Sequence, residues 1–581
     1  MSLLSATSLV DRTNLGLLAA LLPLCGVLGG VEGVAHAETP ITSASTPDAF
    51  SLPIPPNGLV NPFDLNEDEL TRAGREGRRS LLDYPATETT LGAPYSAINR
   101  LYYRLNRKPL LRLAMRRRGY SDVGRGWNDV YETASLVPYP RSEGEGAYFV
   151  PFPNSGRPAA PMGFAVFPDR NRSPVFTVAC ASCHTRNLFG RPVMGAANLE
   201  GGSSDSLMVL KHVANLRDLQ YRIATRPTGG ELAAFHNMQH QLSFVQGKRP
   251  QAKGLENPVA FVGMSLATRA DDEFASRRRT GGSQLAEALR KIPTDTKPPV
   301  LWNLKYKNRF QHDGSMTGNP MLANLIFNEI GRGADLVKLE AWIDRNGDEI
   351  RDMTAAAYAM EAPRWTNFFS AQSIDLERAK RGEIAFNQRC AECHGTYEKA
   401  WSQADRESLS PVELLRTTRV VVPEETIVRN VGTDANRSRA MVLLAERANE
   451  LRIFRNNGIS FEANPGAYVP PPLVGIWARW PYMHNNAIPN LDELLKPSAQ
   501  RAKAFYVGGA DDARTDYDRA KVGFPLGEKT PRDWRRTANL FDTRKPGLSN
   551  AGHDEGIFAK DGVSQFAPGE KADLIEFLKT L

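Results

Sequence analysis

Apolar residues recur with helical spacing at the C-terminal end of the chain. The segment opens at residues 567–570, and its apolar stripe at i, i+3 and i+4 spacing consists of Leu574, Ile575, Phe577, Leu578 and Leu581. A second helical pattern starts at Asn66, which is placed as an N-cap before three acidic residues. Residues 120–175 instead carry many aromatic residues, prolines and glycines, which predict irregular structure with short hairpins. We expect a mainly α protein with long irregular loops.

The first 37 residues have the layout of a secretory signal peptide. An apolar run over residues 15–31 is followed by Ala35-His-Ala37, a small-x-small cleavage site. An uncleaved membrane anchor is the alternative, although the run is short for a membrane span. A lipoprotein anchor at Cys25 is disfavoured because Leu24, which is not a small residue, precedes it. We therefore expect a periplasmic or secreted protein.

Residues 38–160 are expected to form an N-terminal extension. Residues 38–65 are rich in Pro, Ser and Thr, which is typical of a flexible leader. The strongly basic stretch 100–118 is interpreted as a solvated helix face, with a docking face for an acidic partner as the alternative. The net charge of +7 is small for 581 residues; it could favour acidic partners, but it says nothing about nucleic acid. No nucleic-acid partner is expected.

Two short motifs carry the chemistry of the chain, and they are Cys180-Ala-Ser-Cys183-His184 and Cys390-Ala-Glu-Cys393-His394. Cys-x-x-Cys-His is the attachment sequence of c-type haem. Residues three apart on a helix share a face, so both thiols can reach the two vinyl groups along one porphyrin edge. The adjacent His then offers its imidazole to the iron as the proximal ligand. We predict two covalently bound c-type haems, with His184 and His394 as iron ligands.

A zinc-binding or redox Cys-x-x-Cys with an accidental His behind it is the alternative, and the double occurrence argues against it. Four of the five cysteines lie in the two motifs, and the fifth lies in the expected signal peptide. The mature chain would then have no cysteine for disulfides. Covalent haem attachment and export both indicate the bacterial periplasm or beyond.

A repeated segment indicates that the chain is duplicated from about residue 161. Each motif is followed by a Pro-Pro segment and then by a His, with 14 positions from Pro298 to His312 and again from Pro470 to His484. A length of 581 residues also predicts two or three domains. We therefore expect two tandem cytochrome c-type haem domains, over residues 161–371 and 372–581.

The tandem motifs and the two Pro-Pro…His segments resemble the bacterial di-haem cytochrome c peroxidase superfamily over residues 160–581. That superfamily includes the enzyme that matures methylamine dehydrogenase. The second half most resembles the rubber oxygenase branch, and the matching stretches are residues 475–477, 491–495, 505–508, 521–524, 541–543 and 550–553. The chain differs from that branch at residues 485–487, where Asn-Asn-Ala replaces the expected Asn-Gly-Ser.

The resemblance implies a division of labour between the two haems. The N-terminal haem has an open or exchangeable sixth position, and it reduces peroxide in the peroxidases or binds dioxygen in the rubber oxygenases, which cleave polyisoprene. The other haem is six-coordinate and stores electrons, and a Trp relays electrons between the two. Trp302 matches the position of this bridging Trp. A structural core Trp is the alternative.

The sixth ligand of the second haem has three candidates. The resemblance places His553 at the position of the C-terminal distal ligand of the family, whereas the repeated segment alone would nominate His484 or Met483. We prefer His553. The first half offers no counterpart that we can place, and His312 and Met316 are our candidates for lining its reaction pocket. His312 either binds the first haem or hydrogen-bonds near the boundary between the halves, and we prefer the second role.

A separate metal site is not expected. His236 and His240 have the i, i+4 spacing that suits one metal, but no acidic third ligand lies in a recognisable frame. His212 is interpreted as a partly exposed helix residue. Residues 344–349 resemble the start of a calcium loop without the rest of an EF-hand, so calcium is a minor alternative.

These observations predict a di-haem c-type oxidoreductase that activates a small-molecule oxidant, dioxygen or peroxide, at the N-terminal haem. An organic or polymeric substrate and a redox partner protein are the further partners that such an enzyme would use. A di-haem electron carrier without substrate chemistry is the alternative. A carrier is usually far smaller, so the large first domain favours an enzyme. The sequence does not separate a peroxidase from an oxygenase.

Overall fold

Helices carry most of the regular structure in the computed structural model, which describes residues 47–107, 126–269 and 282–581. The expected signal peptide lies outside the described residues, as does most of the basic stretch 100–118. The α-helices are α1 Glu67–Asp83, α2 Tyr95–Arg107, α4 Trp127–Thr133, α5 Ser203–Ala214, α6 Asp218–Thr225, α7 Gly229–Ser243, α8 Pro258–Thr268, α9 Gly282–Lys291, α10 Pro320–Gly331, α11 Leu336–Arg345, α12 Gly347–Tyr358, α13 Leu376–Arg389, α14 Ala391–His394, α15 Pro411–Leu414, α16 Asn436–Glu450, α17 Arg452–Arg455, α18 Leu491–Leu494 and α19 Glu570–Leu578.

The strands are short and pair antiparallel, in one three-stranded sheet of order β1-β3-β2 and several two-stranded ribbons. The strands are β1 Ala93–Pro94, β2 Phe164–Pro168, β3 Pro174–Val178, β4 Thr185–Leu188, β5 Arg191–Met194, β6 Met316–Thr317, β7 Thr396–Lys399, β8 Thr417–Val421, β9 Ser460–Phe461, β10 Ala504–Tyr506, β11 Leu540–Asp542, β12 Ala559–Lys560 and β13 Val563–Ser564. The β2–β3 hairpin, with Phe164 opposite Val178, closes the aromatic-rich segment for which hairpins were expected.

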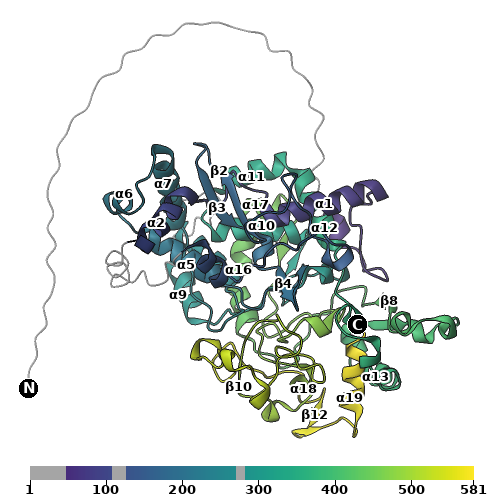
Figure 1. Ribbon diagram of the computed structural model, residues 1–581. Coiled ribbons are helices and arrows are strands. Elements are labelled where there is room, and N and C mark those ends of the chain that lie inside the picture. The colour runs from purple at the N-terminus through teal and green to yellow at the C-terminus, as the bar shows by residue number, and fades with distance from the viewer. Residues whose placement is uncertain (1–46, 108–125, 270–281) are drawn as a thin grey trace, which may run out of the picture. The chain divides into compact units, whose positions relative to one another are not determined.

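Two pairs of helices pack closely against each other, α1 with α12 and α13 with α19 (Figure 1). The start of α1 is as predicted, because the Asn66 side chain accepts from the Glu69 backbone at 3.0 Å and the Glu69 carboxylate accepts from the Asn66 backbone at 3.1 Å. The predicted terminal helix is α19, and the apolar side chains of its stripe are buried against the core. Each pair therefore joins a helix that precedes a Cys-x-x-Cys-His motif to one that lies beyond it.

Each crossing is made possible by a glycine. A Cβ atom on Gly77 of α1 would lie 2.0 Å from the carbonyl oxygen of Asp352, and one on Gly382 of α13 would lie 2.0 Å from that of Asp573. Real Cβ atoms do not come so close to backbone, so a side chain at either position would push the helices apart. Sequence analysis assigned α1 to an N-terminal extension and missed its pairing with α12.

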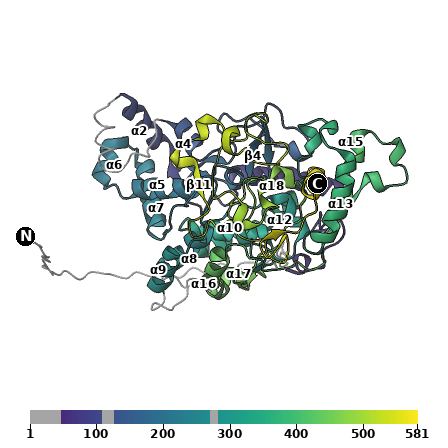
Figure 2. The same cartoon turned by 90° about the horizontal axis from the view of Figure 1, so that it is seen from below.

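The remaining core gathers around α8, whose residues from Val259 to Leu266 are all buried. Figure 2 shows α8 with α9 and α16 at its side, and α10 also packs against it. All the described residues belong to one compact unit, Ser43–Leu581. Within the described ranges, the helices are too short or too polar to span a bilayer.

Candidate haem sites

The two Cys-x-x-Cys-His motifs fold into the same tight turn. In the first, the backbone N–H groups of Cys183 and His184 both donate to the carbonyl of Cys180, at 3.2 and 3.0 Å. In the second, the N–H groups of Cys393 and His394 donate to the carbonyl of Cys390, at 3.2 and 2.9 Å. In such a turn, residues three apart share a face, which is the arrangement of the two thiols that haem attachment requires.

The first thiol of each motif does not have the character of a redox cysteine. The four motif cysteines are free and partly buried. Burial raises the pKa of Cys180 to about 11 and that of Cys390 to about 12. A redox Cys-x-x-Cys instead needs a lowered pKa, because the thiolate is the reactive form. The pKa values therefore argue against the redox alternative.

Each motif His is held by the carbonyl of a proline from the repeated segment. The Nδ1 atom of His184 lies 3.0 Å from the Pro299 oxygen, and that of His394 lies 2.7 Å from the Pro471 oxygen. Burial lowers the pKa of both imidazoles to about 4, so both are neutral and donate from Nδ1. The Nε2 lone pair is then free for a metal. The Pro-Pro repeat was the sequence signal for these two carbonyl contacts, but sequence analysis did not assign it that role.

The two repeated segments exchange backbone hydrogen bonds. The N–H of Lys297, directly before Pro298, donates to the His484 carbonyl at 2.7 Å. In return, the N–H of Val469, directly before Pro470, donates to the His312 carbonyl at 2.8 Å. The same contact is thus made twice, with the roles of the two segments exchanged. Such a reciprocal contact indicates two-fold symmetry. The segments therefore face each other across an approximate two-fold axis.

The backbone of the two segments agrees in detail beyond this exchange. Phe310 pairs with Met316 in an isolated antiparallel bridge, and the equivalent residues Tyr482 and Ile488 pair in the same way. The residue that precedes each His has a positive φ, 64° at Gln311 and 69° at Met483. Agreement at such unusual backbone positions is strong evidence for an internal repeat.

His312 and His484 face each other at this axis, with ring centres 6.4 Å apart and planes 53° apart. The Nε2 atom of His312 donates to the Lys297 carbonyl at 2.9 Å. The His484 ring stacks on Tyr468 at 4.1 Å, and its buried Nε2 has no partner among the described residues. Burial holds the pKa of both imidazoles well below the usual range, so both are neutral.

His553 lies against His394, with ring centres 6.2 Å apart and planes only 17° apart. Two imidazoles that each bind one iron through a nitrogen at about 2 Å have ring centres roughly 6 Å apart. The Nδ1 atom of His553 is buried without a partner in the described structure, and burial lowers the pKa of the ring to about 3. The separation of these two neutral imidazoles therefore fits a haem iron held by His394 and His553.

Trp302 joins the two repeated segments through its indole. It lies in the 3₁₀ helix Leu301–Tyr306, is 1% exposed, and donates from Nε1 to the Val474 carbonyl at 3.1 Å. Trp302 is three residues beyond Pro299, and Val474 is three residues beyond Pro471. The indole therefore bridges the segments that hold His184 and His394. Met316 is fully buried in β6, opposite Phe461 of β9.

The other histidines and the calcium-like segment do not converge on a metal. His236 contacts Asp218 at 2.8 Å, whereas His240 packs edge-on against Phe244. His212 lies on α5 and hydrogen-bonds to the backbone one turn earlier. Residues 344–349 form the junction of α11 and α12. In the described ranges, no three His, Cys, Asp or Glu side chains gather as a metal site.

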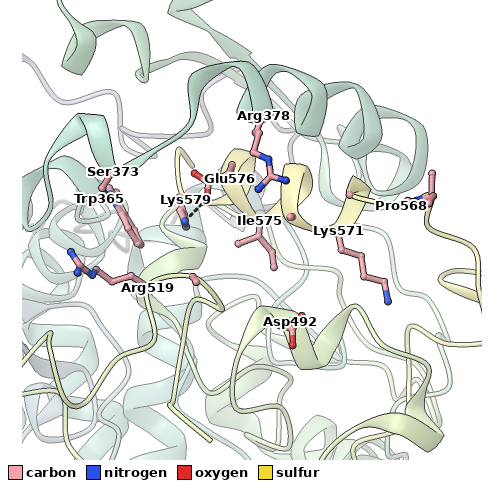
Figure 3. Close-up of a pocket in the computed structure, with 14 residues that line it drawn as sticks. Trp365, Ser373, Arg378, Asp492, Arg519, Pro568, Lys571, Ile575, Glu576 and Lys579 are labelled. Atoms are coloured by element: carbon pink, nitrogen blue, oxygen red, sulfur yellow. Dashed lines mark hydrogen bonds and ion pairs between the residues drawn. The ribbon is translucent and has the colours of Figure 1, made fainter. Parts of the chain in front are cut away.

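A surface pocket of about 800 Å³ lies beside α19 and is lined by none of the motif residues (Figure 3). Lys579 in its wall pairs with Glu576 at 2.5 Å, and the ammonium lies 5.2 Å from the centre of the Trp365 ring. This pocket is separate from the candidate haem sites.

Comparisons with known proteins point to the same part of the chain. Residues 467–506, which include the second Pro-Pro…His segment, match the family described as "RoxA-like, cytochrome c-like". The match supports a relationship to RoxA-like cytochromes c and a covalently bound haem with iron. It reaches neither of the Cys-x-x-Cys-His motifs themselves.

Two proteins of Sinorhizobium fredii are also similar, and both are named as uncharacterised. The first, y4iJ, is 31% identical over 263 residues, which cover 38% of this chain and 41% of that protein. The second, y4iM, is 29% identical over 243 residues, which cover 36% of this chain and 49% of that protein. The chain thus spans less than half the length of these relatives.

Proposed function

We propose that the chain is a periplasmic or secreted di-haem c-type oxidoreductase. The observation that supports this best is that the two motifs share the same turn and the same hydrogen bond from their His. His184 and His394 each follow the same turn and each donate from Nδ1 to the second proline of a repeated segment. Cys180 and Cys183 would hold the N-terminal haem, and Cys390 and Cys393 would hold the C-terminal haem.

The first haem domain would begin at α1 rather than at residue 161. The crossing of α1 with α12 repeats that of α13 with α19, down to the glycine at the point of contact. In this proposal, residues between α1 and the first motif are an insertion within the first domain. The second domain would span 372–581, as the sequence repeat predicts.

The two sites differ on the side opposite the motif histidine. His553 lies against His394, but within the described residues no imidazole faces His184 in the same way. A haem iron with an open position binds and reduces dioxygen or peroxide. We therefore assign oxidant activation to the N-terminal site and electron storage to the C-terminal site.

The side chains of the chain itself would orient and connect these groups. The Pro299 and Pro471 carbonyls fix the tautomer of each motif His, which keeps Nε2 available to iron. Trp302 would carry electrons between the sites, because its indole spans the two segments that hold these histidines. An organic or polymeric substrate and a redox partner protein remain the expected partners of such an enzyme.

The test is a haem count combined with carbon monoxide binding to the reduced protein. Mass spectrometry of the denatured mature chain should show two attached haems, and carbon monoxide should bind one of them. Activity is then followed as peroxide consumption with a reduced redox partner, and as dioxygen consumption with an alkene substrate. A single haem would contradict the proposal. Two haems that ignore carbon monoxide and peroxide in every redox state would make the protein an electron carrier.

A further inference from the structure

Four basic side chains gather beside the two repeated segments, and this cation cluster consists of Arg186, Lys297, Lys307 and Arg479. The Nζ atom of Lys297 donates to the carbonyls of Arg479 and Pro481, at 3.2 and 2.6 Å. The guanidinium of Arg186 donates to the carbonyls of Ala478 and Trp480, at 2.9 and 3.1 Å. Arg186 and Lys297 therefore bind the stretch of backbone to which Arg479 belongs, and Lys307 lies close enough to feel the charge of Arg479.

Among the described residues, no Asp or Glu forms an ion pair with any member of the cation cluster. The nearby buried Arg437 shows the contrast, because it pairs with Asp313 at 2.8 Å. Two nitrogens of Arg186, Nε and Nη2, are buried without a hydrogen-bond partner in the described structure. Burying like charges together without an anion is unfavourable.

The lysines of the cluster show the electrostatic cost of this arrangement. Burial, and then the charges of Arg479 and Arg186, hold the pKa of Lys297 well below its usual range. Burial and the charge of Arg479 lower the pKa of Lys307 to about 8. An anion within the cluster would reverse these shifts, because an opposite charge favours the protonated form.

The internal repeat assigns one member of the cluster to each motif. Lys307 is eight residues beyond Pro299, and Arg479 is eight residues beyond Pro471. Arg479 donates to the carbonyl of Pro472, directly beside the proline that holds His394, at 2.6 Å. Lys307 is therefore the equivalent residue for the site of His184.

We propose that the cation cluster binds the propionate carboxylates of the two haems, with Arg479 serving the haem at His394 and Lys307 the haem at His184. This inference rests on the proposed function. Each haem carries two carboxylates, so two haems would supply as many anions as the cluster has cations. Charge-assisted hydrogen bonds from Lys and Arg to carboxylate are among the strongest in proteins. The propionates would then supply the negative charges that the cation cluster lacks, without an acidic residue of the protein.

The test measures the midpoint potentials of the two haems in Arg479→Gln and Lys307→Gln by spectroelectrochemistry. A cation beside a propionate favours the reduced iron, so its removal should lower the potential of one haem and leave the other near the wild-type value. Arg479→Gln should act on the low-spin haem and Lys307→Gln on the haem that binds carbon monoxide. Arg78→Gln is the matched control, because Arg78 is also buried but donates to the Phe149 carbonyl in α1 packing.

Conservative variants keep the test decisive if a glutamine variant fails to mature. Arg479→Lys and Lys307→Arg keep the charge, so the potentials should stay near wild type while the resonance Raman bending bands of the propionates shift. Potentials and propionate bands that stay unchanged in all four variants would overturn the inference. That result would leave the proposed function standing if the haem count is two. A wild-type protein without two haems would instead remove the proposed function itself.

Discussion

The imidazole rings of His394 and His553 lie 6.2 Å apart although the residues are far apart in sequence. His394 is fixed from behind by the Pro471 carbonyl, and His553 is fixed by its backbone N–H, which donates to the Val431 carbonyl at 2.9 Å. The two rings are therefore positioned independently. Their near-parallel planes and neutral state would allow both to hold a haem iron.

Replacing His553 by Gly should convert one low-spin ferric haem to the high-spin form, since the iron loses a strong-field ligand. Glycine is chosen because residue 553 has a φ of 52° and tolerates it without strain. Absorption and electron paramagnetic resonance spectra of the oxidised protein follow the change. His484→Ala is the control and should leave both spin states unaltered; the reverse pattern would assign the ligand to His484.

Trp302→Phe should slow electron transfer between the haems and leave both haems attached. The variant also loses the hydrogen bond to the Val474 carbonyl, which costs about 1 kcal/mol of stability. Flash photolysis of the carbon monoxide complex measures the transfer rate. Trp477→Phe is the matched control, because Trp477 is equally buried and donates to the Pro363 carbonyl at 3.0 Å. Equal rates in the two variants would rule out a special role for Trp302.

Gly77→Ala should destabilise the protein by roughly 2–3 kcal/mol, because the new methyl group would overlap the Asp352 backbone at the helix crossing. Gly74 provides the control on the same helix, since a Cβ there meets nothing within 4 Å. Gly74→Ala should stabilise the helix by up to about 1 kcal/mol. Urea unfolding of the two variants against wild type measures both effects, and similar values for both would contradict the close crossing.

Stability should fall as the pH drops below about 6.5, in part because of His484. Burial holds its pKa well below the usual range in the folded state, whereas the unfolded chain takes up a proton near pH 6.5. Below that pH the unfolded state is favoured by about 1.4 kcal/mol per pH unit for this group. His484→Phe keeps a ring to stack on Tyr468 and cannot be protonated, so it should flatten the dependence.

Urea unfolding between pH 7 and pH 5 measures this slope. His236→Phe is the control, because the His236 ring is about half exposed beside Asp218. A slope that is equal in wild type and His484→Phe would show that another group governs the acid response.

The local and periodic signals in the sequence were informative. The capped start of α1, the terminal helix α19, the haem motifs and the Pro-Pro repeat all follow from short-range patterns. The repeat indicated a duplication of the chain, but the two-fold exchange between Lys297 and His484 and between Val469 and His312 was not predicted from it. Such patterns are visible because each rests on residues that are close in sequence.

Long-range pairings were out of reach. The crossing of α1 with α12 joins Gly77 to Asp352, and a glycine within a helix does not show which helix it will meet. The first motif also lies almost a hundred residues beyond α1, which hid the parallel with α13. The cation cluster was missed for a similar reason, because four separate basic residues form no pattern until the chain folds.

The exchanged hydrogen bonds at the two-fold axis also bear on motion within the molecule. Opening the seam between the two segments would break the bond from Lys297 to His484 and the bond from Val469 to His312 together. A hinge at this seam is therefore unfavourable, and the spacing of His184 and His394 should be the same in every molecule. Electron tunnelling would then follow one fixed path, with its rate set by driving force rather than by domain closure.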